Sequence, residues 1–333
     1  MHRLSGYLAS ASIALGLLCT PASAKLITFQ VPGSTGTVPL AISNKGEVTG
    51  WFSDQAGQHG FVRAADGSIT TIDLPDATLT YPTAINGEGA IVGLAVIQTS
   101  TRKHRVAFLR TPDGQITEFQ APQGKSETVA TSIDNAGWIA GWAKHSGGTG
   151  SLFGFLRDPS GHFTVFGEDL TVSCANSANT TAGSVSDGSV LHGFVRTADG
   201  TITQFDPDGA TYTIVNAINN AGTTTGIHAK TPGNIYDAFI RAADGTISSF
   251  AADARARSTT PRGINDAGVI AGYYENKAHQ GIYHGFVRTP DGTITTVDVH
   301  GASSTWLYGI NRKDQATGAA QVNGEYVGFI WKP

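Results

Sequence analysis

The chain has 333 residues, a formal net charge of −4 at pH 7 and only 14% charged residues. Mild acidity without a run of Lys or Arg argues against nucleic acid and anionic membranes as partners. The 42 glycines and the many Thr, Ile and Val residues indicate short strands joined by tight turns, so we expect an all-β protein.

The first 24 residues have the pattern of a secretory signal peptide. Arg3 supplies a positive start, residues 12–19 form an apolar stretch, and residues 22–24 form a small-residue cleavage site. We therefore expect cleavage near Ala24, a single mature domain of residues 25–333, and a secreted or periplasmic location. No later stretch is long enough to span a bilayer, so membrane insertion is not expected. Cys174 is then the remaining thiol, interpreted as a small buried residue.

From residue 26 onward one unit recurs along the chain. Its clearest mark is a short strand with Phe at its start and, in every copy but the last, Arg at its end: Phe61–Arg63, Phe108–Arg110, Phe155–Arg157, Phe194–Arg196, Phe239–Arg241, Phe286–Arg288 and Phe329–Trp331. Successive copies are 47, 47, 39, 45, 47 and 43 residues apart, a period typical of solenoids and propellers. No linker interrupts the repeat, which predicts one repetitive domain.

Each unit has the pattern of four strands. In one copy these are residues 259–265, 269–272, 285–288 and 294–298, separated by turns that contain Gly. Four hairpin-connected strands in about 45 residues are the blade of a β-propeller. Seven copies predict seven four-stranded blades, with the N-terminal strand, residues 26–30, completing the last blade and closing the ring. The alternative is a β-solenoid, in which no terminal strand would be missing.

Two columns of residues stand out when the first strands are aligned. The first column predicts structural hydrogen bonds inside each blade and consists of Thr37, Thr80, Thr128, Thr171, Thr213, Thr259 and Thr305. Three residues further on, the second column consists of Leu40, Thr83, Thr131, Cys174, Asn216, Arg262 and Tyr308. If the first strands line the axis, this second column faces a shared channel. Arg262 and Tyr308 are its most chemically capable members.

The two faces of the expected ring differ in their loops. On one face Asp-Gly turns repeat almost unchanged, and the Arg before each turn is interpreted as a structural clamp. On the opposite face, which we call the variable face, the loops between second and third strands and between fourth and first strands differ from copy to copy. A specific function is expected there.

The repeat resembles a known family. The segment His284-Gly285-Phe286-Val287-Arg288-Thr289-Pro290-Asp291-Gly292, preceded by Gly263-Ile264-Asn265-Asp266-Ala267-Gly268, resembles the repeats of the bacterial extracellular HAF family. The resemblance covers nearly all of residues 25–333 and implies a secreted repeat protein, with no catalytic residue to carry over. His59, His192 and His284 begin this motif but other copies lack the His, so a catalytic His in every unit is not expected. The Asp-Gly turns also resemble those of the virginiamycin B lyases, which are seven-bladed propellers.

The first functional hypothesis is a binding module for extracellular carbohydrate. Aromatic rings stack on sugar faces, and Trp51, Trp142 and Tyr273 share one column at the ends of second strands on the variable face. Together with Arg262, Trp306 and Tyr308 they are the candidate ligand-binding residues. The alternative is that these rings pack between blades.

The second hypothesis is an enzyme with an axial active site. A polysaccharide lyase needs a base, for which His228 or Tyr274 is the candidate, and a cation for the uronate carboxylate, for which Arg262 is the candidate. Tyr308 is a further candidate catalytic residue at the axis. A glycoside hydrolase needs two facing carboxylates, of which Glu275 is one candidate. A third hypothesis is a scaffold for extracellular protein partners. We expect a monomer without a cofactor or a metal site, although turn aspartates leave a structural Ca²⁺ open.

Overall fold

The computed structural model of the protein describes residues 24–98, 103–124, 127–145, 150–231, 233 and 235–333. The regular elements within these ranges are 28 β-strands, which confirms the all-β class. The expected signal peptide lies outside the described residues except for Ala24. In the described part of the chain no helix has the length and apolarity needed to cross a membrane.

The strands follow one another at short intervals. The first fourteen are β1 (Lys25–Phe29), β2 (Gly36–Ile42), β3 (Val48–Ser53), β4 (Gln58–Arg63), β5 (Ile69–Ile72), β6 (Ala77–Ile85), β7 (Ile91–Gln98), β8 (Lys103–Arg110), β9 (Ile116–Phe119), β10 (Glu127–Ile133), β11 (Ile139–Lys144), β12 (Leu152–Arg157), β13 (Phe163–Phe166) and β14 (Leu170–Ala175). The rest are β15 (Thr181–Ser186), β16 (Leu191–Arg196), β17 (Ile202–Phe205), β18 (Tyr212–Ile218), β19 (Thr224–Ala229), β20 (Asp237–Arg241), β21 (Ile247–Phe250), β22 (Ala256–Ile264), β23 (Ile270–Asn276), β24 (His279–Arg288), β25 (Ile294–Val297), β26 (Ser304–Ile310), β27 (Ala316–Val322) and β28 (Glu325–Lys332).

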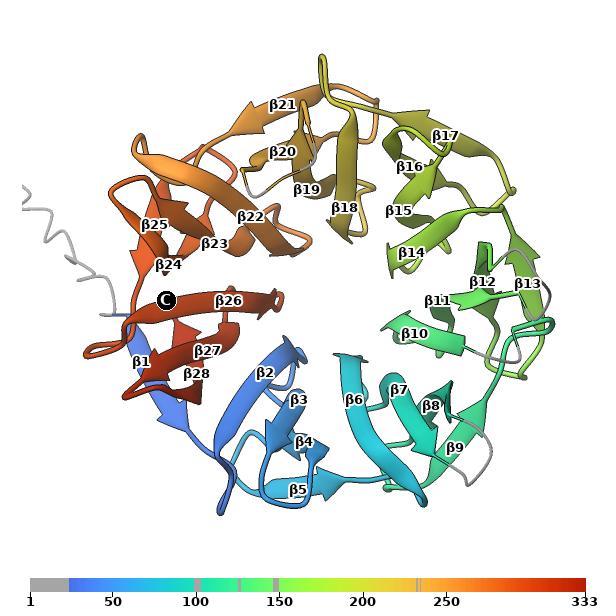
Figure 1. Ribbon diagram of the computed structural model, residues 1–333, viewed down its shortest axis with the longest axis horizontal. Coiled ribbons are helices and arrows are strands. Elements are labelled where there is room, and N and C mark those ends of the chain that lie inside the picture. The colour runs from blue at the N-terminus through green and yellow to red at the C-terminus, as the bar shows by residue number, and fades with distance from the viewer. Residues whose placement is uncertain (1–23, 99–102, 125–126, 146–149, 232, 234) are drawn as a thin grey trace, which may run out of the picture.

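Consecutive strands pair antiparallel in sets of four, which we call blades and name by their strands. These sets are β2–β5, β6–β9, β10–β13, β14–β17, β18–β21 and β22–β25. Strands β26, β27 and β28 form a further set, and β1 pairs antiparallel with β28, with Leu26 opposite Trp331. Figure 1 shows the sets around a central opening with their first strands innermost, which is the arrangement of a β-propeller.

The Phe of each third strand forms the core between neighbouring blades. These side chains are 0% exposed: Phe61, Phe108, Phe155, Phe194, Phe239, Phe286 and Phe329. In every copy with this Arg except that of Arg110, the Arg that ends the strand stacks on an aromatic ring of the preceding fourth strand, as Arg241 does over Phe205 at 4.9 Å and Arg288 over Phe250 at 5.0 Å. The Arg residues are therefore structural clamps, and they contact the preceding blade.

Each first strand carries a β-bulge at the point where it faces the channel. The bulged residues, which have no partner in the pairing with the second strand, are Leu40, Thr83, Thr131, Ser173, Asn216, Arg262 and Tyr308. A bulge bends the strand and redirects a side chain. A glycine of the second strand lies against it, and a Cβ on Gly226 would lie only 1.9 Å from the carbonyl oxygen of Ile214.

The predicted columns are wrong in one blade. In β14 the residue opposite Val185 is Leu170, not Thr171, and the bulge falls on Ser173, not on Cys174. The strand is therefore displaced by one residue from the sequence alignment, because the chain reaches it through a shortened connection. In the other blades the threonine column is buried and hydrogen-bonded, as in the bonds that Thr37 Oγ1 and Thr259 Oγ1 accept from backbone N–H groups.

Candidate functional site

Cavities follow one another along the central channel. A cavity of about 410 Å³ lies at the end formed by the turns between first and second strands. It shares its Ile lining with a mid-channel cavity of about 450 Å³. Tyr308 lines both this mid-channel cavity and a third cavity of about 590 Å³ on the variable face. The channel thus joins two chemically different ends.

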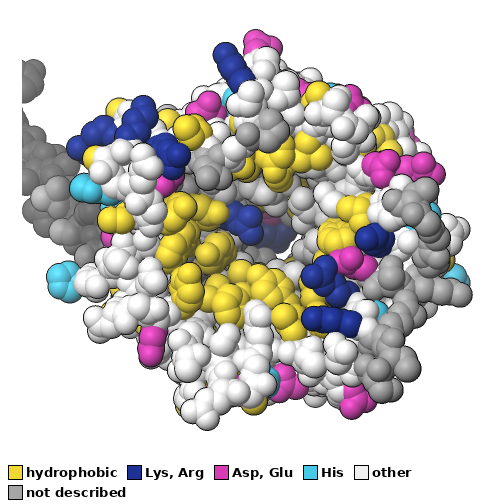
Figure 2. Space-filling view, in the orientation of Figure 1, with side chains coloured by type: hydrophobic (Ala, Val, Ile, Leu, Met, Phe, Trp, Pro, Cys, Tyr) yellow, Lys and Arg dark blue, Asp and Glu magenta, His cyan; other side chains and the backbone are white. Residues whose placement is uncertain are grey.

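The cavity on the variable face, which we call the aromatic pocket, is lined by rings. Of its described lining residues seven are aromatic: Trp51, Tyr236, Tyr273, Tyr283, Trp306, Tyr308 and Tyr326. Val38, Arg257, Ser258, Thr260 and Glu275 complete it. Figure 2 shows hydrophobic side chains gathered beside the central opening, on the side where Figure 1 has β2 and β26.

The rings contact one another in a continuous series. Tyr308 meets Tyr273 with 6.2 Å between ring centroids, and Tyr273 meets Tyr283 edge to face at 5.7 Å. Tyr283 then meets Trp306 at 5.5 Å, and Trp306 meets Tyr326 at 5.8 Å. These packed rings hold one another in fixed orientations, so the pocket wall is organised before any ligand enters.

The two described charged residues of the pocket wall are paired with each other. Arg257 Nη1 donates to Glu275 Oε2 at 2.8 Å, and the Glu275 side chain is only 6% exposed. The second carboxylate oxygen of Glu275 accepts a hydrogen bond from the Gly281 N–H at 2.7 Å. This buried pair is therefore satisfied within the protein and adds no net charge to the pocket.

Arg262 lines the mid-channel cavity and, unlike Arg257, is not paired with a carboxylate of the described residues. Its guanidinium carbon lies 5.8 Å from the centroid of the Tyr308 ring, and the side chain is exposed to the channel. Among the described residues it has no hydrogen-bond or ion-pair partner. A planar cation with five unused N–H donors therefore stands at the inner edge of the aromatic pocket.

The tyrosines around Arg262 stay protonated. Burial strongly raises the pKa of Tyr308. Burial also raises the pKa of Tyr81, although a hydrogen bond from Trp51 and the charge of Arg262 act in the opposite direction. These hydroxyls therefore serve as neutral hydrogen-bonding groups at ordinary pH.

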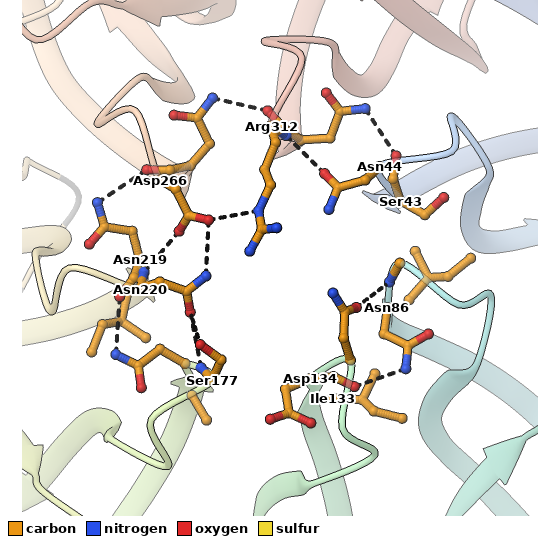
Figure 3. Close-up of a pocket in the computed structure, with 18 of the residues that line it drawn as sticks. Ser43, Asn44, Asn86, Ile133, Asp134, Ser177, Asn219, Asn220, Asp266 and Arg312 are labelled. Atoms are coloured by element: carbon orange, nitrogen blue, oxygen red, sulfur yellow. Dashed lines mark hydrogen bonds and ion pairs between the residues drawn. The ribbon is translucent and has the colours of Figure 1, made fainter.

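At the opposite end of the channel, a ring of Asn side chains, which we call the amide belt, lines the cavity of about 410 Å³ (Figure 3). Asn86, Asn176, Asn219, Asn265 and Asn311 each donate through Nδ2 to the backbone carbonyl of the equivalent residue in the next blade, at 2.8 to 3.1 Å. A second tier includes Asp266, which accepts from Asn220 and lies 2.7 Å from Arg312 Nε. Because these groups bond one another across blade boundaries, we interpret the amide belt as structural.

The structure separates several of the predicted site residues. Trp142 lies opposite Gly154 as Trp51 lies opposite Gly60, but it is not part of the aromatic pocket. His228 hydrogen-bonds Ser249 Oγ at 2.9 Å and lines a separate hollow beside Asp206. Tyr274 is 5% exposed and stacked on His284, within the core between blades. Neither His228 nor Tyr274 lines the cavity of Arg262, so the predicted pairing of either residue with Arg262 is corrected.

Other predicted residues do meet. Trp51, Tyr273, Glu275, Trp306 and Tyr308 all line the aromatic pocket, and Arg262 lies against Tyr308. Sequence reasoning missed the other seven described lining residues, which are Val38, Tyr236, Arg257, Ser258, Thr260, Tyr283 and Tyr326. The tyrosines among them lie near the starts of third strands, and this shared position was a signal, whereas Arg257 lies on the first strand β22 and carried none. In the described part of the chain, no group of three or more His, Cys, Asp or Glu residues could hold a metal ion.

The sequence matches no protein-family model, and no curated protein matches it. The fold is similar to solved structures. A structure described as streptogramin B lyase aligns with TM-score 0.61 and 16% identity, over 92% of this chain and 97% of that chain. A virginiamycin B lyase from Staphylococcus aureus aligns with TM-score 0.59 and 17% identity, over 92% and 99%.

A third solved structure is similar to this chain over only part of its own length. The acylaminoacyl peptidase of Pyrococcus horikoshii aligns with TM-score 0.59 and 10% identity, over 90% of this chain and 52% of that chain. At such identities the likeness shows a shared β-propeller fold, and one fold serves many chemistries. Any functional assignment must therefore come from the residues of this chain.

Proposed function

We propose that the protein binds extracellular carbohydrate in the aromatic pocket. The observation that carries this proposal is the contrast between two sets of rings. The Phe residues between blades are 0% exposed, whereas the Trp and Tyr residues of the pocket keep part of their surface open, up to 38% for Tyr326. Rings needed only for packing would be buried like the Phe residues, so these rings are available to a ligand.

The chemistry of the pocket suits a sugar. Pyranose rings present apolar C–H faces that stack on Trp and Tyr, while their hydroxyls need hydrogen bonds at the ring edge. The hydroxyls of Tyr283, Tyr308 and the nearby Thr260 supply such groups, whereas the Ser258 hydroxyl is already bonded to the backbone of Tyr236. The cavity of about 590 Å³ is within the usual range for small-ligand sites.

The test compares two tryptophans. Trp306→Ala should weaken binding of a responsive oligosaccharide by about thirtyfold, since buried aromatic contacts carry the largest share of binding energy. Trp142→Ala is the matched control, because Trp142 lies outside the pocket. Calorimetric titration of residues 25–333 against a panel of neutral and uronate oligosaccharides measures both variants. Equal losses in the two variants, or none in Trp306→Ala, would contradict the proposal.

A lyase is the second candidate, favoured by the position of the unpaired Arg262 beside Tyr308. The raised pKa of Tyr308 makes it a poor base at neutral pH, so this reading ranks below binding. Glu275 is the one carboxylic acid among the described lining residues of the aromatic pocket, whereas a hydrolase uses two. Mass spectrometry of polysaccharide digests separates the cases. Unsaturated ends indicate a lyase, added water indicates a hydrolase, and no products favour binding alone.

We also propose the finer architecture and location. Seven repeats and the pairing of β1 with β28 support a seven-bladed ring closed by the N-terminal strand. The repeat motif supports a relationship to the HAF family, and the pattern of residues 1–24 supports export with cleavage near Ala24. The mass of the mature protein recovered from its native host tests the cleavage site.

A further inference from the structure

Arg262 is the one charged residue among the bulged residues of the first strands, all of which are described. Three of the six polar members of this column, Thr83, Thr131 and Asn216, bond through their side chains to backbone carbonyl groups. Thr83 Oγ1 donates to the Ala130 carbonyl at 2.8 Å, Thr131 Oγ1 to the Ala140 carbonyl at 3.2 Å, and Asn216 Nδ2 to the Pro261 carbonyl at 2.8 Å. These side chains are used by the fold. Arg262, in the same column, makes no such bond to any described residue.

Arg262 also carries the one unbalanced charge among the described lining residues of the aromatic pocket and the mid-channel cavity. The charged residues that line the aromatic pocket and the mid-channel cavity within the described ranges are Arg257, Glu275 and Arg262. Arg257 and Glu275 neutralise each other at 2.8 Å. The joined cavities therefore carry one net positive charge, in a chain whose formal net charge is −4. An unpaired cation in a partly enclosed space attracts an anion more strongly than it would on an open surface.

Tyr308 connects this charge to the aromatic pocket. It lines both cavities, and the Arg262 guanidinium stands over its ring at 5.8 Å. A saccharide stacked on Trp306 and Tyr273 at the pocket can thus extend a substituent past Tyr308 toward the guanidinium. The planar fork of Arg fits a carboxylate through two parallel hydrogen bonds.

We propose that the ligand is an acidic saccharide whose uronate carboxylate pairs with Arg262. This inference rests on the proposed carbohydrate function and names its substrate class. A sulfate ester offers similar oxyanion chemistry. The carboxylate is preferred because one guanidinium balances one unit charge in a cavity whose other ion pair is already complete.

The experiment uses ligands that differ only in charge. Residues 25–333 are titrated with trigalacturonate, with its methyl ester, and with trimannuronate and its methyl ester. The wild-type protein should bind at least one free acid about tenfold more tightly than its ester. Arg262→Gln should abolish this preference and leave ester affinity within about twofold, and Arg262→Lys should keep part of it. Arg255→Gln is the control, since Arg255 is exposed and its partner is Asp253.

The outcomes distinguish the two proposals. Equal wild-type affinity for acid and ester, or a preference that survives Arg262→Gln, overturns the role of Arg262 but not carbohydrate binding. Tighter binding of a sulfated neutral trisaccharide than of either uronate overturns the uronate assignment. Absence of binding to every saccharide overturns both. Because Arg262 is exposed and has no bond to the fold, its variants should melt at the wild-type temperature, so a lost preference reports on binding.

Discussion

At the scale of single residues, the histidines of the repeat motif work as pairs with aspartate. His59 Nδ1 lies 2.9 Å from Asp73, and His284 Nδ1 lies 2.8 Å from Asp298. His192 forms the same pair with Asp206. Units without the His also lack the Asp, and carry Gln120, Gly167, Ala251 and Gln30 at the matching position. The two residues therefore form one structural unit that joins the third strand to the end of the fourth.

These pairs predict a pH dependence of stability. The hydrogen bond to Asp206 raises the pKa of His192, with burial opposing it and Asp187 adding to it. For His59, burial acts to lower the pKa, but Asp73 and Asp54 together raise it. A group whose pKa is raised in the folded state stabilises the protein fully below its unfolded pKa of about 6.5 and loses that contribution as pH rises through the folded value.

We therefore expect the double variant His59→Gln/His192→Gln to lose more melting temperature near pH 5.5 than near pH 8.5, because about 5.5 is below the ordinary pKa of His and about 8.5 is above its titration range of about 5 to 8. Thermal unfolding across that range measures the difference. His300→Gln, at an exposed loop residue, is the control and should give parallel curves. A loss that is the same at both pH values would show that the pairs act through packing alone.

Some residues of the aromatic pocket could be predicted from the sequence and others could not. Trp51, Tyr273 and Tyr308 could be chosen because repeat alignment assigns them to columns with a known direction. Tyr236, Tyr283 and Tyr326 could not be chosen, because they lie near loops of differing length where the alignment loses register. Which blades approach one another closely enough to share a pocket depends on loop conformation, and that is a tertiary property.

At the scale of elements, the bulge and the glycine that faces it form a recurring device. A Cβ on Gly318 would lie 1.8 Å from the Trp306 carbonyl oxygen, and one on Gly141 would lie 2.1 Å from the Val129 carbonyl oxygen. Real Cβ atoms do not approach a carbonyl so closely, so the first strand can bulge only where the second strand has no side chain. The repeated Gly of the second strand is therefore a packing requirement.

Gly226→Ala should consequently cost about 2–3 kcal/mol or more of the free energy of unfolding, since the clash is with backbone and cannot be relieved by a rotamer change. Urea denaturation compares it with Gly233→Ala, where no atom lies within 4 Å of the added Cβ. Equal stability of Gly226→Ala and the control would contradict this expectation, because it would mean that the bulge can move to accommodate the added methyl group.

Strand existence and type were predictable at this scale, because Phe, Gly and Asp-Gly recur at fixed offsets within each unit. The fourth unit was misaligned by one residue for a physical reason. Its positive-φ residues Gly167 and Asp169 turn the chain sharply into β14, which shortens the connection and moves Leu170 into the place of the threonine. A period read from sequence cannot show which side of a strand has lost a residue.

At the scale of the whole molecule, the two ends of the described chain share one sheet. All five residues of β1 pair with β28, from Lys25 opposite Lys332 to Phe29 opposite Gly328. Phe29 also contacts Phe61 of the β2–β5 blade at 6.0 Å and receives Arg63 over its ring. The N-terminal strand therefore binds both its own blade and the next one.

Deletion of residues 25–30 should lower the melting temperature by about 5 °C or more, since it exposes the edge of β28 and removes the stacking partner of Arg63. A synthetic peptide of residues 25–33 added to the truncated protein should restore part of the loss, because it can pair with β28 again. Lys25→Ala, at an exposed position of the same strand, is the control in calorimetry. Truncation without thermal effect would contradict the proposed ring closure.

The propeller architecture itself was predictable because it depends on a period and on local turns, both of which are written along the chain. The aromatic pocket was less predictable because it lies between units, where residues of β22, β23, β24, β26 and β28 lie around Trp51.

The bulges determine where side chains that line the channel can be substituted. Each directs one side chain into the lumen at a point that takes no part in the pairing with the second strand, and the occupants range from Leu40 to Arg262 without altering the surrounding strands. Substitutions of Arg262, whose side chain makes no hydrogen bond to a described residue, should leave folding largely intact, whereas Thr83, Thr131 and Asn216 are bonded to the backbone of the channel wall. Under the proposed binding function, the specificity of the lumen can be altered by exchanging a few residues, which makes it a convenient starting point for engineered recognition.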